Sequence, residues 1–401
     1  MAFFGIKNHQ TLAYLKKNSY LCIVKRIFLI FLLCNLAVLQ FICFTQRGQS
    51  PLCNSASAAE QPNKVRFLYD VDFLLNFDNR ESHTPLETSG TIFGIRLTPT
   101  VGVGYADSIV GSHRLLAGVS YIQPFGSRWR DARVHPTVYY QFAKRGFTLN
   151  FGFVPYKNMI QPLPDYLMSD SLRFFYPNIQ GALLQYQSRW GHVEALADWR
   201  GMMKDSTREA FRLIGGGLFL YRQLYTGGYV QMNHLSHSEH QLGVCDDVMA
   251  NPLIGANLTS LTPLDTLYIQ AGYLMSWQRD RVAHLSSVSH GLHAELGLRW
   301  RFIGMRSELY YGGNAMPLYS GYGPLLNQGD PKYQARLYSR TDVYLCMFHY
   351  RFATAYAAWN FIYTLGDGLS HRQEVIACFN LDELMTYIRS RRSSVASSAK
   401  R

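Results

Sequence analysis

Cysteine is scarce in this chain, and its cysteines are poorly spaced for a metal site or a disulfide framework. Four of the seven lie before residue 54, and Cys245, Cys346 and Cys378 are far apart and odd in number. The P-loop, GxGxxG, HExxH and CxxC motifs are all missing after residue 59. We therefore predict no metal site and no cofactor.

Acidic residues are missing from the first 59 residues, which carry six basic ones, and the last twenty residues are basic as well. The formal net charge of +12 thus comes mostly from the two ends, and about +3 remains between them. A central segment so nearly neutral gives no support to a nucleic-acid partner. The mean hydropathy of −0.09 argues against a bundle of membrane helices.

Residues 27–44 contain no charge and follow a basic segment that ends in Lys25 and Arg26. Small residues come next, with Ala56 and Ala58 in the positions of an A-x-A cleavage site. This order predicts a signal peptide over residues 1–59, cleaved near 58/59. The alternative is an uncleaved membrane anchor, because 18 apolar residues can span a bilayer.

After the leader, apolar and polar residues alternate with a period of two, most clearly from Val65 to Phe77. Successive side chains of a strand point to opposite faces, so one face of this segment is apolar and the other carries its charges. The run is longer than the roughly 5–6 residues of a typical soluble strand and suits the roughly 9–11 of a membrane-crossing strand. The apolar face consists of Val65, Phe67, Tyr69, Val71, Phe73, Leu75 and Phe77.

The same pattern recurs in about 16 segments, with 14 as the second choice, and the connectors between them alternate between long and short. A soluble sandwich also alternates along each strand, but long strands, alternating connectors and a secretion signal together favour a membrane barrel. We predict an all-β fold over residues 60–381, a single antiparallel transmembrane β-barrel with short periplasmic turns and long extracellular loops. Residues 382–401 are predicted to form a basic, disordered periplasmic tail.

Five sequence blocks carry a resemblance to a known family, and they are Tyr69–Glu81, Phe93–Gly104, His113–Gly126, Ser169–Gly181 and Gly329–Tyr333. Through them the chain resembles an uncharacterised family of Bacteroides-type, porin-like outer-membrane barrel proteins. The resemblance implies a place in the outer membrane of a Gram-negative cell, with its lipid and the barrel assembly machinery as partners. It implies no particular activity.

Arginine far outnumbers lysine on the face predicted to line the lumen, the space inside the barrel. An arginine-lined constriction would pass or bind small polar solutes with a mild preference for anions. The alternative is a network of salt bridges between strands that only stabilises the wall. The residues predicted to line the lumen are Arg66, Asp70, Asp72, Arg96, Arg114, Arg212, Glu295, Arg299, Arg301 and Arg340.

One motif points to an enzyme instead. His234 and Ser236 lie two apart at the predicted extracellular end of a strand, a spacing similar to the His-x-Ser pair of outer-membrane lipid A deacylases. Glu239 is the candidate acid, while His237 stands where those enzymes have Asn. Alternation places His234 and Ser236 on the lumen side, away from lipid, so we predict that the chain is not an enzyme and keep the lipid hydrolase as an alternative.

A third possibility is a structural or surface-interaction barrel with a plugged lumen. The connectors Pro155–Pro177 and Gly312–Tyr333 are long and rich in Pro and Gly. Long loops of this kind in barrels often fold inward or cover the mouth.

Overall fold

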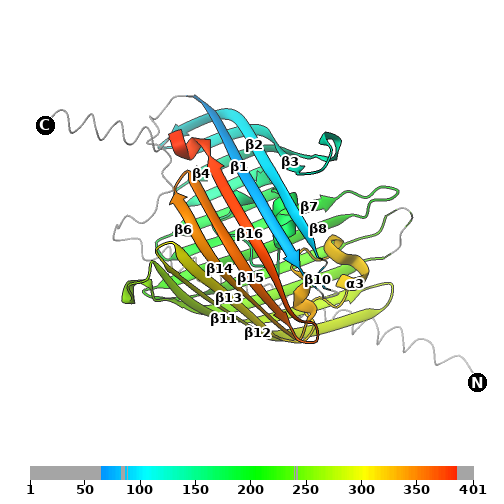
Figure 1. Ribbon diagram of the computed structural model, residues 1–401. Helices are drawn as coiled ribbons and strands as arrows, with labels where there is room; N and C mark the ends of the chain where they lie inside the picture. The colour runs from blue at the N-terminus through cyan, green and yellow to red at the C-terminus, as the bar shows by residue number, and fades with distance from the viewer. Residues whose placement is uncertain (1–64, 83–85, 88, 239, 241–242, 386–401) are drawn as a thin grey trace, which may run out of the picture. The chain divides into compact units, whose positions relative to one another are not determined.

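The computed structural model describes residues 65–82, 86–87, 89–238, 240 and 243–385, and within them the chain forms one closed antiparallel barrel (Figure 1). The predicted fold and the count of 16 strands are confirmed. The strands are β1 (Arg66–Glu81), β2 (Gly90–Asp107), β3 (Gly111–Pro124), β4 (Arg133–Lys144), β5 (Phe147–Pro155), β6 (Asn178–Ser188), β7 (Gly191–Gly201), β8 (Ala210–Tyr221), β9 (Leu224–Leu235), β10 (Cys245–Asn257), β11 (Thr266–Asp280), β12 (Leu285–Trp300), β13 (Ile303–Gly312), β14 (Leu337–Tyr350), β15 (Ala353–Thr364) and β16 (Gly368–Asn380).

The ring closes because every strand pairs with its two sequence neighbours and β1 pairs with β16. That last pairing runs from Asp72 opposite Asn380 to Glu81 opposite His371, so the first and last strands leave no free edge. A closed ring satisfies the backbone hydrogen bonds of every strand, which is the condition for a sheet to cross a membrane.

The outer face of the ring is apolar, as the two-residue period predicts. Phe67, Leu292 and Trp300 are 67%, 62% and 53% exposed, although residues of these types are usually buried in a soluble protein. Their sequence neighbours point inward, and Asn76 and His293 are buried. The hydrophobic outer band is the surface that a barrel presents to lipid.

The connectors follow the predicted alternation, with two exceptions on the long side. The connectors after β11 and β15 cover only residues 281–284 and 365–367, because β12 and β16 begin earlier than their apolar patterns indicate. On the short side, the connector 258–265 after β10 contains a 3-10 helix, η3 (Thr259–Leu261). Another 3-10 helix, η1 (Trp129–Asp131), lies in the connector after β3.

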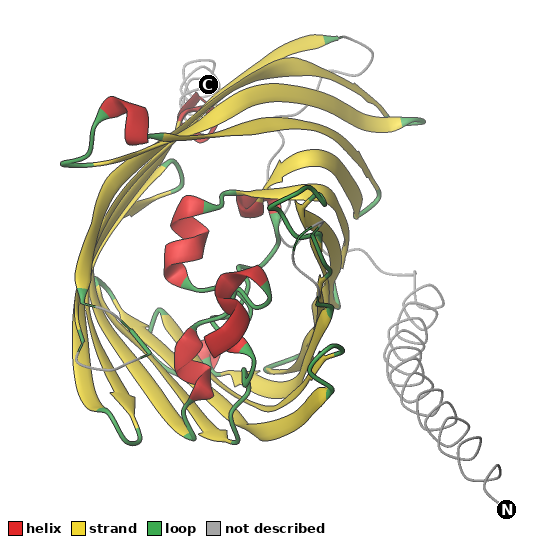
Figure 2. Cartoon of the chain, turned by 90° about the vertical axis from the view of Figure 1, so that its right-hand side faces the viewer, coloured by secondary structure: helices red, strands yellow, loops and turns green. Residues whose placement is uncertain are grey.

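Two connectors fold into the lumen, and we call them the first inner loop (156–177) and the second inner loop (313–336). Figure 2 shows their helical segments inside the ring of strands. The first contains η2 (Tyr156–Asn158) and α2 (Asp170–Phe175); the second contains α3 (Tyr319–Tyr322), η4 (Gly323–Leu325) and η5 (Pro331–Gln334). The core of the molecule is the place where these loops meet the wall, with Tyr166 and Tyr333 fully buried there.

The ends of the chain are only partly described. Residues 381–385, which include the start of the predicted tail, are helical, and Arg351 Nε lies 2.5 Å from Glu383 Oε2. The predicted signal peptide and residues 386–401 lie outside the described residues. In the described part of the chain, no helix is both long and apolar enough to span a membrane.

Candidate functional site

The first inner loop is tied to the lumen wall from its first residues. The Tyr156 hydroxyl donates a hydrogen bond of 2.8 Å to Asp198 Oδ2 on β7 and also contacts Arg212 on β8. Lys157 forms ion pairs with Asp70 and Asp72 on β1. One loop therefore connects strands on opposite sides of the ring.

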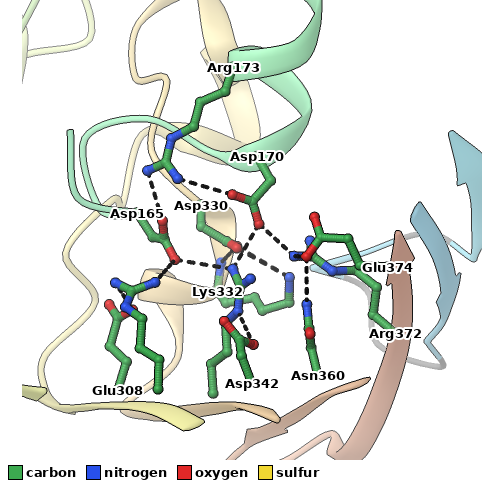
Figure 3. A network of polar contacts seen from close by, with 12 residues as sticks. Asp165, Asp170, Arg173, Glu308, Asp330, Lys332, Asp342, Asn360, Arg372 and Glu374 are labelled. Atoms are coloured by element: carbon green, nitrogen blue, oxygen red, sulfur yellow. Dashed lines mark hydrogen bonds and ion pairs between the residues drawn. The ribbon is translucent and has the colours of Figure 1, made fainter. Parts of the chain in front are cut away.

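Two carboxylates of this loop, Asp165 and Asp170, meet a group of arginines from the wall (Figure 3). Asp170 Oδ2 lies 2.8 Å from Arg340 Nη1 and 2.6 Å from Arg372 Nη2. Asp165 Oδ2 lies 3.1 Å from Arg340 Nη1 and 3.5 Å from Arg306 Nη1. The wall arginines are thus neutralised by acids that the loop carries into the lumen.

The same arginines control the ionisation of the loop carboxylates. Burial by itself would raise the pKa of Asp170, but the charges of Arg340, Arg372 and Arg173 together outweigh it and hold the pKa well below 3.8. The pKa of Asp165 is also lowered, because Arg173, Arg306 and Arg340 outweigh its burial. Both groups are therefore charged over the whole physiological range of pH.

The second inner loop is held by a separate set of contacts. Asn327 donates a hydrogen bond of 3.1 Å to Asp247 Oδ2, which is fully buried on β10. Lys332 Nζ lies 2.9 Å from Glu87 Oε1 and 3.3 Å from Asp330 Oδ2. Asn327 thus attaches the second loop to the wall and Lys332 attaches it to the connector after β1. The backbone of Asp330 also donates to the Asp165 carbonyl at 2.8 Å, so the two loops are joined to each other.

A cavity of about 390 Å³ remains between α2 and the lumen wall. Its charged lining residues balance in sign, with four arginines and four acids, and its remaining side is apolar and aromatic. The lining residues are Leu74, Asn76, Asp78, Ile92, Arg96, Asp170, Ser171, Arg173, Phe174, Arg306, Arg340, Asp342, Tyr344, Tyr356, Ala358, Glu374 and Ile376.

Most of the residues predicted to line the lumen lie on the inward register of their strands. Arg96 donates a hydrogen bond of 2.9 Å to the Arg173 carbonyl of α2. Glu295 accepts a hydrogen bond of 2.9 Å from Arg306. The other inward residues are Asp70, Asp72, Arg212 and Arg340 in the contacts above, and Arg66, Arg114 and Arg299, all three half-buried.

The prediction for Arg301 is wrong. Arg301 lies in the two-residue turn between β12 and β13, with φ of 54°, and is exposed. Its guanidinium lies 5.2 Å from the ring centroid of Trp300 on the outer face. The alternating pattern continues to Phe302, but β12 ends two residues earlier at Trp300, so the Arg301 side chain belongs to the turn and not to the lumen wall.

The prediction that His234 faces the lumen is also wrong. On β9 the inward residues are the tyrosines, since Tyr229 donates to Gln161 of the first inner loop at 3.3 Å. His234 points outward, where its ring centroid lies 5.0 Å from that of Phe211. Its Nδ1 lies 2.8 Å from Asp246 Oδ1, and Arg281 Nε donates to Asp246 Oδ2 at 2.8 Å.

Ser236 follows the last residue of β9, and its Oγ lies 3.1 Å from His237 Nδ1. Glu239 lies outside the described residues. The acid that contacts His234 is Asp246, which the pairing of β9 with β10 places opposite it. The sequence pattern alone does not identify this partner, because it depends on the register across a loop. In the described ranges, no three His, Cys, Asp or Glu side chains are grouped to hold a metal ion.

Comparison with known proteins gives a family. The sequence model of the Lipid A 3'-O-deacylase-type family matches residues 59–359. The chain belongs to this family. That result fits the predicted resemblance to Bacteroides-type barrels, and together with the closed ring and the apolar outer band it makes the protein an outer-membrane β-barrel. No curated protein matches the chain significantly.

Three solved structures similar to this family member share little sequence identity with it. A loop L8 deletion mutant of OmpT, an outer-membrane protein of Vibrio cholerae, has a TM-score of 0.48 at 11% identity, covering 80% of this chain and 100% of its own. OpdK from Pseudomonas aeruginosa has a TM-score of 0.47 at 10% identity, covering 79% and 99%. A mutant porin of Rh. blastica has a TM-score of 0.43 at 9% identity, covering 79% and 100%.

Proposed function

We propose that the protein is a narrow porin-like barrel for passage or binding of small polar solutes. The observation that carries this proposal is the polar cavity between α2 and the wall, inside a ring that the inner loops fill only in part. A cavity of about 390 Å³ lies within the range of about 300–1,000 Å³ that is usual for small-molecule sites.

The arginines of the lumen give little reason for a strong preference for anions. Arg340 and Arg372 are paired with Asp170, and Arg212 with Asp198. A paired guanidinium presents little net field to a passing ion, so selectivity between small anions and cations is expected to be weak.

Planar-bilayer recording of the purified full-length barrel tests this proposal. We expect small, discrete conductance steps and slow swelling of proteoliposomes in small polar solutes. A permeability ratio for chloride over potassium near one would agree with the paired lumen charges. If no current flows at any voltage and the proteoliposomes do not swell, the structural barrel with a plugged lumen is supported instead.

A second candidate function, a lipid acyl hydrolase, is favoured by the contact of His234 with Asp246 on the outer wall. A carboxylate on Nδ1 orients a histidine so that Nε2 is free to act as a base toward a serine hydroxyl. Ser236, two residues further along the chain, is the candidate for that serine. The outer rim is where such a site would meet outer-leaflet lipid, and the family name mentions lipid A deacylation. Ser236 Oγ contacts His237 in this structure. In an active site it would have to bond to His234 instead.

The Ser236→Ala variant decides between the two candidates. If Ser236 is a nucleophile, the variant should lose lipid deacylation by several orders of magnitude while folding normally, and mass spectrometry of lipid A from cells expressing each form measures this. Ser286→Ala, an exposed serine on β12, is the matched control. If lipid A carries the same acyl chains in cells that express the wild type, in cells that express Ser236→Ala and in cells without the barrel, the hydrolase function is ruled out.

A further inference from the structure

Several tyrosines of the lumen lie with their rings against the backbone of a neighbouring strand. Each one is opposite a glycine, and a Cβ added at Gly304 would lie only 2.2 Å from Tyr344 Cζ. A Cβ at Gly297 would lie 2.1 Å from Tyr268 Cε1, in the same arrangement. Because the glycine leaves room for the ring, one ring face rests on the wall and the other is turned to the lumen.

Tyr344 brings this feature into the cavity beside α2, where Tyr356 lies next to it. They come from the neighbouring strands β14 and β15, both line the cavity, and their ring centroids are 6.4 Å apart at an interplanar angle of 64°. Phe174 of α2 is a third aromatic residue in the lining. One side of the cavity is therefore an aromatic surface.

The polar part of the cavity lining consists of charged groups that are already paired with one another. Arg340 contacts both Asp170 and Asp342, the latter at 2.7 Å, and all three line the cavity. Arg173, also in the lining, pairs with Asp170 at 3.1 Å, so two arginines balance these two acids. An ion would therefore gain little and would have to break existing pairs. A guanidinium has five N–H donors and a carboxylate about four acceptor sites, which leaves capacity for further hydrogen bonds to uncharged hydroxyls.

We propose that this cavity binds a neutral polyhydroxylated solute, a mono- or disaccharide. The apolar C–H face of a sugar ring would lie on Tyr344 and Tyr356, while its hydroxyls would bond with the Arg340, Asp342 and Asp170 groups. An apolar solute cannot satisfy these charged groups, and a small dicarboxylate such as succinate lacks the apolar ring face that a sugar offers to the tyrosines. The inference rests on the proposed function, because it names the solute class for that lumen.

Equilibrium binding of sucrose to the detergent-solubilised full-length barrel, measured by calorimetry, tests the site itself. We expect saturable binding, with sodium succinate and sodium glutamate as charged probes binding at least about tenfold more weakly. Tyr344→Ala and Tyr356→Ala should each weaken sucrose binding severalfold, whereas Tyr344→Phe, which retains the ring, should bind nearly as wild type. Tyr363→Ala, on the lipid-facing side of β15, is the matched control and should bind as wild type.

Conductance separates this inference from the proposed function. Sucrose that reduces the single-channel current in a saturable way, and less so in Tyr344→Ala, supports both. Ion current without any saturable effect of sucrose and without calorimetric binding overturns the sugar site and leaves the pore. Binding of sucrose to a barrel that never conducts overturns passage and leaves the site. Unaltered binding in both alanine variants would show that the two rings only fill space beside the lumen wall and do not contact the sugar.

Discussion

Replacing both Asp165 and Asp170 by asparagine should release the first inner loop from the lumen wall and raise the single-channel conductance severalfold. The two carboxylates supply the loop's ion pairs to Arg306, Arg340 and Arg372. The side chains of Arg340 and Arg372 are only 7% and 3% exposed, so their charges depend on nearby acids. Arg340 keeps Asp342 and Arg372 keeps Glu374 as partners after the change, so a detached loop leaves no unpaired charge behind. The double variant therefore removes the ionic attachment of the loop without a charge penalty that opposes its release.

Hydrogen exchange over residues 156–177 measures the release directly, and bilayer recording measures its effect on current. Asp342→Asn is the matched control, because it also removes a carboxylate from Arg340, at 2.7 Å, but from strand β14 and not from the loop. We expect the control to retain the loop protection that the double variant loses. Unaltered exchange in the double variant would mean that the hydrophobic contacts around Tyr166 hold the loop without its charges.

Acid should open the wild-type loop in the same way. The pKa of Asp170 in the folded protein is well below its ordinary 3.8, so its stabilising contribution is complete above pH 3.8 and is lost as the pH falls through the lower, folded value. The part of the loop's protection that these ion pairs provide should therefore be retained from pH 7 to pH 4 and lost only below it, which hydrogen exchange over residues 156–177 at each pH measures.

The barrel could be predicted from the sequence because lipid imposes a two-residue period on almost every strand. From Val65 to Phe77 both faces of the strand are unambiguous, since one carries only apolar residues. On β9 the same reasoning fails, because Tyr225 and Tyr229 are apolar enough for the outer face yet point inward to Gln270 and Gln161. Tyrosine suits lipid interfaces and polar lumens equally well, so alternation alone cannot assign its side.

The two-residue period of the strands could not identify the acids that pair with the lumen arginines. Asp165 and Asp170 lie in a connector with no repeating pattern, and their partners on β13, β14 and β16 are more than 130 residues away in sequence. Apart from Arg301, alternation placed the predicted arginines on the wall, but it could not indicate that a loop would neutralise them. The same limit applies to Asp246, whose contact with His234 follows from strand register.

Asp198→Asn should destabilise the barrel strongly, because it removes the counter-charge of a fully buried arginine. Arg212 is 0% exposed, and its Nε lies 3.3 Å from Asp198 Oδ2. The same carboxylate accepts hydrogen bonds from the Tyr156 hydroxyl and the Gln180 amide at 2.8 and 2.9 Å, which an asparagine oxygen can in part retain. The loss is therefore mainly the charge, and an unpaired buried guanidinium costs about 3–5 kcal/mol.

Urea unfolding of the barrel in detergent, carried out for both single variants and the double variant, separates a charge effect from a packing effect. Arg212→Met and Asp198→Asn should each lower the free energy of unfolding, while Arg212→Met with Asp198→Asn should recover most of the loss, since no unpaired charge remains. Leu213→Met, on the outer face next to Arg212, is the control and should cost less than about 1.5 kcal/mol. If the double variant instead loses the sum of the two single losses in unfolding free energy, each side chain acts through its own contacts. Tyr156 would then be held by packing and not by the ion pair.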